Sequence, residues 1–173
     1  PEELVSSPFS HLHNNTQFSV LQSTSRIANI VKKAAESNMP AIAITDRGNM
    51  MGCFHFIKAI KNYNNSISTD SSDTKIKPII GCELNVCSNH KDKSNRDDGY
   101  QIIFLAKNKN GYRNLSKMCS IGYTKGFYYV PRVEREVVEK YKEDLIVLSG
   151  NMRGEIASKL LNLGESQDED ALL

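Results

Sequence analysis

The hydrophobic positions of the chain form short apolar runs that alternate with longer segments of helical periodicity. Apolar runs of strand length are followed by segments in which apolar residues recur every three or four positions. This pattern predicts strands at residues 9–13, 41–45, 78–86, 101–106 and 145–148. It predicts helices at residues 25–38, 49–63, 114–121, 134–142 and 155–163.

Strands that alternate with helices indicate an α/β fold built from βαβ units, with mainly parallel strands. Five strands are too few for an eight-stranded barrel, so we expect a truncated fragment of a larger barrel. Residues 1–173 are interpreted as one such fragment. Residues 64–74 are polar and of low complexity, which predicts a mobile surface insertion. Residues 165–173 are read as a linker into a helix that is cut off.

The composition excludes several classes of protein. The 22 Lys and Arg nearly balance the 20 Asp and Glu, giving a net charge of +2, so the case for nucleic acid is weak. A low-ranked alternative is direct DNA contact through scattered basic residues: Lys91, Lys93, Arg96, Lys107, Lys109 and Arg113. No apolar run reaches about 18 residues, so no membrane span is expected.

The cysteines indicate the redox compartment. Cys53, Cys82, Cys87 and Cys119 form no Cys-x-x-Cys pair and fall in predicted helices or strands. We therefore expect reduced, mostly buried thiols of a cytosolic protein, and we find no export signal at the start of the chain.

The polar residues that follow the predicted strands are the candidates for chemistry, because parallel α/β folds place their sites there. The residues able to bind a metal are His11, His13, Asp46 and Glu83. Simpler roles remain open, since such a histidine is often only hydrogen-bonded and Asp46 could cap the helix starting near Asn49. Glu83, in an apolar strand, needs a cationic or hydrogen-bonding partner if buried, and Arg47 is one candidate.

Other catalytic patterns are missing from the sequence. It contains no Gly-x-Ser-x-Gly elbow and no glycine-rich phosphate-binding loop of the common types. His55 and His90 have no second ligand at a useful spacing and are interpreted as structural or solvated.

Four segments closely resemble one family. They are His-Leu-His-Asn-Asn-Thr-Gln-Phe-Ser at 11–19, Met-Pro-Ala-Ile-Ala-Ile-Thr-Asp at 39–46, Lys-Pro-Ile-Ile-Gly-Cys-Glu at 77–83 and Gly-Phe-Tyr-Tyr-Val-Pro-Arg at 126–132. Together they resemble the N-terminal polymerase and histidinol phosphatase (PHP) domain of bacterial replicative DNA polymerase III alpha subunits. The resemblance covers about residues 9–163. It implies a distorted seven-stranded β/α barrel whose active members bind up to three metal ions and hydrolyse phosphoesters.

The resemblance also implies which positions correspond to metal ligands. Two of the seven covered positions keep a ligand, and the other five hold amides or a guanidinium; in order they are His13, Asn15, Gln22, Arg47, Glu83, Gln101 and Asn151. His11 and Asp46 are weaker ligand candidates. We therefore expect a degenerate metal site, no catalytic residue and no cofactor in this segment, with Arg47 pairing with Glu83.

Two functions follow from the resemblance. The leading one is a catalytically silent domain in the alpha chain of a DNA-directed DNA polymerase, which supports the rest of that cytoplasmic chain and docks a proofreading exonuclease subunit. DNA would then be bound through the parent polymerase and weakly or not at all by this segment. The alternative is residual phosphoesterase or 3′–5′ exonuclease activity that depends on Zn, Mn, Fe or Mg.

Overall fold

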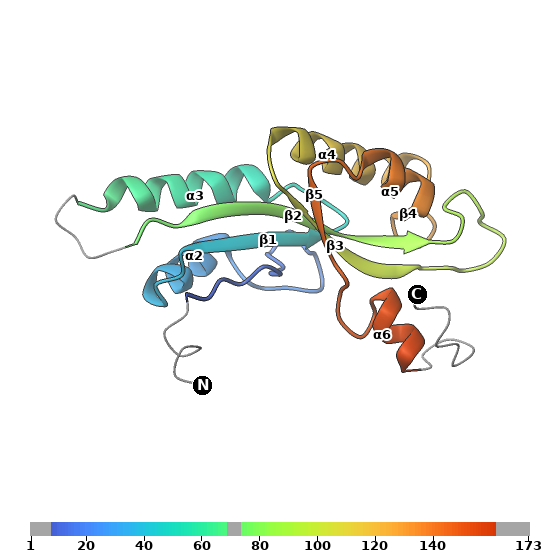
Figure 1. Ribbon diagram of the computed structural model, residues 1–173, viewed down its shortest axis with the longest axis horizontal. Helices are drawn as coiled ribbons and strands as arrows, with labels where there is room; N and C mark the ends of the chain where they lie inside the picture. Colours follow the sequence, from blue (N-terminus) through green and yellow to red (C-terminus); the bar gives the residue numbers. More distant parts are fainter. Residues whose placement is uncertain (1–7, 69–73, 162–173) are drawn as a thin grey trace. The chain divides into compact units, whose positions relative to one another are not determined.

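The computed structural model describes residues 8–68 and 74–161, which divide into two compact units, residues 1–80 and 81–173 (Figure 1). The first unit holds α2 (Ile27–Glu36), β1 (Ala41–Arg47), α3 (Cys53–Ser66) and the start of β2 (Lys77–Cys87). The second holds the rest of β2, then β3 (Tyr100–Ala106), α4 (Lys109–Thr124), β4 (Arg132–Glu134), α5 (Arg135–Tyr141), β5 (Leu145–Leu148) and α6 (Glu155–Leu160).

In the first unit, α2 and α3 bury apolar stripes with β1. The core contains Ile27 and Val31 of α2, Ile44 of β1, and Phe56 and Ile60 of α3. Burial of β1 on both faces accounts for its continuous apolar sequence. This part of the chain buries enough apolar surface to hold the polar β1 end in place.

The two aromatic side chains Phe54 and Phe56 of α3 differ in burial. The helical period of residues 49–63 favours packing for both, but only Phe56 is fully buried and Phe54 is 73% exposed. The buried positions are Cys53, Phe56 and Ile60, which are spaced by three and four residues. Phe54 therefore lies outside this stripe, although it is apolar.

The low-complexity segment is also partly ordered. Its first residues, 64–66, close α3, and the side chain of Asn64 donates to the carbonyl of Ile76 at 2.9 Å and accepts from its amide at 2.9 Å. Residues 64–66 are therefore part of a helix, and the mobility expected of residues 64–74 stays a prediction. Residues 69–73 and the expected terminal linker, 165–173, lie outside the described residues.

The sheet is mixed, with strand order β1-β2-β3-β5 and with β4 paired to β2. β4 runs parallel to β2, but β3 runs antiparallel to both β2 and β5. The expectation of mainly parallel strands is therefore met only in part. The reason is that residues 88–99, between β2 and β3, contain no helix to carry the chain back for a parallel pairing.

The predicted first strand, residues 9–13, is not a regular strand. This segment instead runs beside β1, with the amide of Ala43 donating to the His11 carbonyl and the amide of Thr45 donating to the Asn14 carbonyl. The two donors are two residues apart in β1, but their acceptors are three residues apart in this segment. The unequal spacing prevents a regular ladder.

In the second unit, α4 packs against β3 and β4, and α5 packs beside α4 (Figure 1). The thiols of Cys82 in β2 and Cys119 in α4 lie 3.5 Å apart, which identifies the sheet face that α4 covers. All four cysteines are buried, as expected from the sequence, and none of them forms a disulfide. No described helix has the length and apolar character needed to cross a bilayer.

Candidate functional site

The end of β1 carries a buried carboxylate that organises the preceding loop. Asp46 is 2% exposed and accepts from the Thr16 amide at 2.6 Å, the Thr16 hydroxyl at 2.8 Å and the Ser19 hydroxyl at 2.7 Å. These donors come from the turn at residues 16–19. Asp46 thus ties this turn to the strand end, a role that the sequence did not indicate, and its roles as a metal ligand or helix cap stay predictions.

Thr45, one residue earlier, fixes the histidine loop. Its hydroxyl lies 2.7 Å from Nδ1 of His13 and accepts from the Asn14 amide at 3.0 Å. The side chain of Asn14 donates to the Ala43 carbonyl at 2.9 Å. His13 is exposed and therefore sits at the rim of the site, with one ring nitrogen held by the strand.

The turn into α3 closes around the same carboxylate. The side-chain NH2 group of Asn49 donates to the backbone carbonyls of Phe18 and Arg47, each at 3.1 Å. The side-chain oxygen of Asn49 accepts from the backbone amide of Met51. A Cβ at Gly52 would lie 3.0 Å from Oδ2 of Asp46. Any larger side chain at Gly52 would push against this hydrogen-bonded carboxylate.

The seven ligand-equivalent positions are divided between the two units. His13, Asn15, Gln22 and Arg47 belong to the first unit, and Glu83, Gln101 and Asn151 belong to the second. The pairing of Arg47 with Glu83 stays a prediction. Gln22 and Asn151 are exposed, as is His11, whose ring packs edge-on against Phe9 at 4.8 Å.

In the second unit, a row of buried polar side chains lies on the sheet face opposite α4. Glu83 pairs with Ile103 and Asn85 pairs with Gln101, so all four point to one side of the sheet. Glu83 and Asn85 are each 4% exposed and Gln101 is 8% exposed. Gln101 is the second residue of β3. Because β3 runs antiparallel to β2, the start of β3 lies beside the carboxyl half of β2.

Asn85 is a member of this row that the sequence analysis missed. Its side-chain oxygen is buried and makes no hydrogen bond. The same is true of the side-chain oxygen of Asn15 in the first unit. The alternation of polar residues at 83 and 85 within an apolar strand was the available signal.

The ligand-equivalent positions hold few of the donors that a multi-metal centre uses. Within residues 8–68 and 74–161, no three His, Cys, Asp or Glu side chains lie close enough together to hold an ion. Asp46 already accepts three protein hydrogen bonds, and the amides at Asn15 and Gln101 are weak ligands for such metals.

A second cluster that the sequence analysis missed is centred on buried Arg132. The guanidinium is 1% exposed and donates to the carbonyls of four residues in two loops: Gly126, Asp97, His90 and Asp92. This arrangement fixes residues 90–97 against β4.

His90 and Glu134 form a buried pair beside Arg132. Nδ1 of His90 lies 2.9 Å from Oε2 of Glu134, whose carboxylate also accepts from the His90 amide. Burial raises the pKa of Glu134, but the hydrogen bonds and charge of His90, helped by Lys91, outweigh it and hold that pKa below its ordinary value. His90 was expected to be either structural or solvated. Because the His90 residue is only 2% exposed, it is a buried structural residue.

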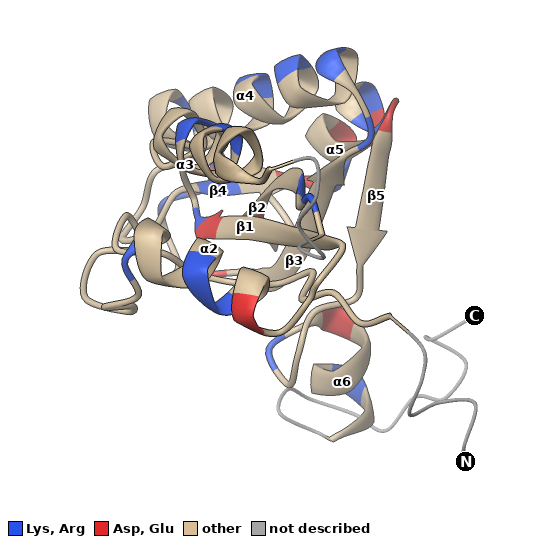
Figure 2. Cartoon of the chain, turned by 90° about the vertical axis from the view of Figure 1, so that its left-hand side faces the viewer, with Lys and Arg blue, Asp and Glu red and all other residues tan. Residues whose placement is uncertain are grey.

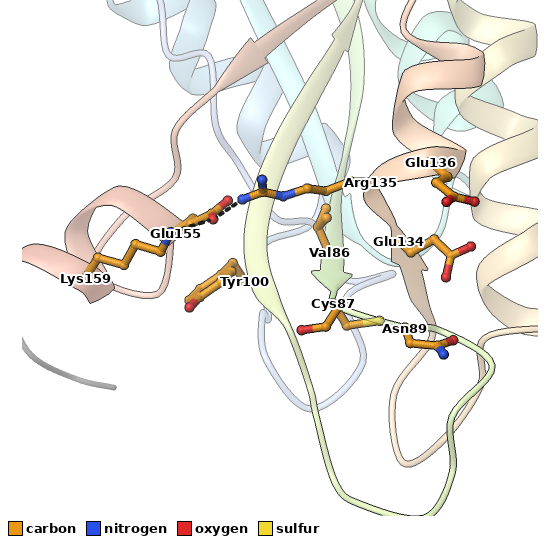
Figure 3. Close-up of a pocket in the computed structure, with 10 residues that line it drawn as sticks. Val86, Cys87, Asn89, Tyr100, Glu134, Arg135, Glu136, Glu155 and Lys159 are labelled. Carbon is orange, nitrogen blue, oxygen red and sulfur yellow. Dashed lines mark hydrogen bonds and ion pairs between the residues drawn. The ribbon is translucent and has the colours of Figure 1, made fainter. Parts of the chain in front are cut away.

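A pocket of about 620 Å³ opens beside this cluster (Figure 3). Its wall contains the apolar Val86, the ring of Tyr100 and several charged groups. Arg135 reaches across it to pair with Glu155, which also pairs with Lys159 at 3.1 Å. Three carboxylates and two cations line the pocket, and both cations pair with Glu155, so the pocket offers no concentrated charge to a ligand.

Comparison with known proteins gives a consistent family. Residues 11–172 match the family model described as PHP domain. Over 165 residues, the chain is 38% identical to the DNA polymerase III subunit alpha of Chlamydia muridarum, covering 93% of this chain and 12% of that protein.

Other relatives carry the same name. The DNA polymerase III subunit alpha of Borreliella burgdorferi is 40% identical over 159 residues, covering 90% of this chain and 13% of that protein. The corresponding protein of Deinococcus radiodurans is 36% identical over 176 residues, covering 95% and 12%. The chain thus spans about an eighth of the length of these relatives.

Proposed function

The chain belongs to the PHP domain family, and on that premise we propose that it serves as the PHP region of a replicative DNA polymerase III alpha subunit. In this proposal the region performs no hydrolysis and supports the remainder of the alpha chain. Replication also implies a cytoplasmic location.

The observation that carries the proposal is the chemistry of the ligand-equivalent positions. Amides stand at Asn15, Gln22, Gln101 and Asn151, and a guanidinium stands at Arg47. A hydrolytic metal cluster needs several anionic or imidazole ligands to hold its cations and to activate water. The hydrogen bonds around Asp46 give the loop an order that requires no metal.

Hydrolysis is tested with protein purified without chelators. Elemental analysis should find zinc, manganese and iron well below one ion per chain, and a 3′-labelled oligonucleotide should release no nucleotide when Mn²⁺ or Zn²⁺ is added. Stoichiometric metal together with metal-dependent release that Glu83→Ala abolishes would overturn the proposal. Asp98→Ala, which removes an exposed carboxylate, is the control for the substitution itself.

We also propose that the region docks a proofreading exonuclease subunit. Support comes from an apolar surface in the first unit, made of Phe18, Met51, Phe54 and His55. The ring of His55 stacks on Phe18 at 5.6 Å and meets Phe54 edge-on at 5.9 Å. Met51 and Phe54 are 62% and 73% exposed, and exposed apolar groups that cluster in this way are typical of protein interfaces.

Docking is tested by titrating the exonuclease subunit of the same organism against the chain. Phe54→Glu should weaken binding about tenfold or more, as expected for an aromatic anchor at an interface. Leu160→Glu places the same charge on a 58% exposed apolar residue of the second unit and should leave the affinity unchanged. Equal binding by the wild type and both variants would reject this surface as the docking site.

A further inference from the structure

The outward face of α4 carries a row of cations that the proposed function does not use. Lys109, Arg113 and Lys117 are spaced by four residues, so they lie along one side of the helix, about 6 Å apart along its axis. The opposite side is buried against the second unit. It contains Gly111, Leu115, Met118, Cys119 and Gly122.

These cations have no nearby acidic residue in their own helix. The sequence of α4 contains no Asp or Glu, and in Figure 2 its outer side is marked with blue segments and no red one. No described carboxylate pairs with any of the three. Some exposed cations elsewhere are paired with carboxylates, for example Arg96 with Asp98 at 2.8 Å and Lys33 with Glu36 at 2.9 Å.

A fourth cation joins the row from α5. The ammonium groups of Lys117 and Lys140 each lie 5.5 Å from the centre of the Tyr141 ring. The Tyr141 ring therefore contacts two cations and brings Lys140 into the same surface region as the α4 row. A polyanion lying on this region would be attracted by both ammonium groups.

Two carboxylates of the neighbouring segment have partners, and two others, Glu136 and Glu143, are exposed. Asp144 accepts from the side chain of Asn110 at 2.9 Å, and Glu139 pairs with Lys142. The pKa of Asp144 lies below its ordinary value because Asn110 and Asn108 donate to it.

The same helix offers an aromatic surface at its carboxyl end. The rings of Tyr123 and Phe127 stack with 6.2 Å between their centres, and they are 48% and 47% exposed. The hydroxyls of Ser120 and Thr124 turn back to donate to helix carbonyls, at 2.9 and 2.8 Å. Small side chains in this position leave the helix surface open between the cations and the aromatic pair.

We propose that this α4 surface, defined as Lys109, Arg113, Lys117, Lys140, Tyr123 and Phe127, binds single-stranded nucleic acid. The regularly spaced cations contact successive phosphates, and the exposed aromatic pair stacks with a base. The sequence analysis gave DNA contact little weight because the basic residues are scattered along the chain. The helix collects two of those residues, Lys109 and Arg113, into one row with Lys117.

The basic loop at residues 88–99 does not share this property. Its Lys91, Lys93 and Arg96 are matched by three aspartates, and Arg96 is held by Asp98. The loop carbonyls are also fixed by Arg132. The charge that favours a polyanion therefore lies on α4 and not on the loop.

The test measures fluorescence anisotropy of labelled oligo-dT with the 173-residue chain across a salt series. Removing two phosphate contacts with Arg113→Gln and Lys117→Gln together should lower the slope of log affinity against log salt by about 1.4, or about 0.7 for each contact. Tyr123→Ala should weaken binding and leave that slope unchanged, because stacking releases no counterions. The matched control removes Lys58 and Lys61, two exposed cations of α3, in the same way.

Two results would overturn the proposal. One is equal binding by the α4 double variant and the α3 control, since nonspecific charge would then explain the affinity. The other is a double variant that loses binding to poly-glutamate but keeps its affinity for oligo-dT, which would identify an acidic protein as the partner. Circular dichroism establishes that each variant is folded.

Discussion

At the scale of single residues, the first unit depends on one carboxylate. Asp46 holds two hydroxyls and one amide of the turn at residues 16–19, all within 2.8 Å. Hydrogen bonds to a buried charged acceptor are stronger than neutral ones, and loss of such an acceptor leaves its donors without partners. Asp46 therefore contributes to the stability of the first unit by holding this turn.

Replacing this acceptor should cost stability. In Asp46→Asn, the NH2 group that replaces one carboxylate oxygen donates and cannot accept, so at least one donor of the turn loses its partner, and we expect a loss of about 1–3 kcal/mol in the free energy of unfolding. Urea denaturation measures it. The matched substitution Asp92→Asn alters an exposed carboxylate that binds Ser94, and it should cost much less. If both variants lost the same amount of unfolding free energy, the structural role assigned to Asp46 would be contradicted.

Glu134 gives the second unit a pH dependence. Because its pKa is held below the ordinary value, its contribution to stability is present at neutral pH and is lost as the pH falls from about 4.3, the ordinary Glu pKa, toward the lowered one. Glu134→Gln should therefore flatten the acid side of the plot of unfolding free energy against pH. Glu136→Gln removes the same charge at an exposed neighbour and should keep the wild-type slope.

At the scale of elements, α4 shows how close approach restricts the sequence. A Cβ at Gly111 would lie 2.2 Å from the carbonyl oxygen of Asp144, whereas a Cβ at Gly122 would meet its nearest neighbour at an ordinary 3.5 Å. Both glycines are buried in the same helix. The two positions therefore differ in the space available for a side chain, although they lie in the same helix.

This difference predicts opposite effects of one substitution. Gly122→Ala should stabilise the protein by up to about 1 kcal/mol, because alanine restricts the unfolded chain and favours helix. Gly111→Ala should destabilise it, since the backbone at Asp144 cannot yield as a side chain would. Thermal unfolding of the two variants measures both effects. A stabilising Gly111→Ala would show that α4 and residue 144 are less closely packed than described.

The elements were largely predictable, and the exceptions have physical causes. Periodicity located the helices and four of the strands, but β4 has only three residues and gives no periodic signal. α4 begins at Lys109, earlier than the predicted 114, because the side chain of Asn108 accepts from the amides of Asn110 and Gly111. That cap is readable in the sequence and was overlooked.

The candidate site was less predictable. The apolar pattern places Asp46 and Glu83 in or just after strands, but it cannot reveal the partners of a buried group. Hydrogen bonds between Asp46 and the turn at residues 16–19 join positions about thirty residues apart. The direction of β3 was also beyond the pattern, because alternation of apolar residues is the same in parallel and antiparallel strands.

At the scale of the whole molecule, the described strands do not close on themselves. β5 ends the strand order, and no described strand pairs with its other edge. Its Ile146 and Val147 are 49% and 51% exposed, although neighbouring residues of a strand point to opposite faces. The seven-stranded barrel expected from the resemblance therefore stays a prediction, and the described part of the sheet is open.

An open edge with apolar residues on both faces should make the 173-residue chain associate with itself. Lysine on an edge strand opposes pairing between sheets, so Val147→Lys should reduce the association that appears as protein concentration rises in sedimentation velocity. The control Val20→Lys replaces a 71% exposed valine of the first unit and should leave association unchanged. If Val20→Lys reduces association as much as Val147→Lys does, general solubility and not the β5 edge is responsible. A selective effect of Val147→Lys would identify β5 as the edge that is exposed when this segment is separated from a longer chain.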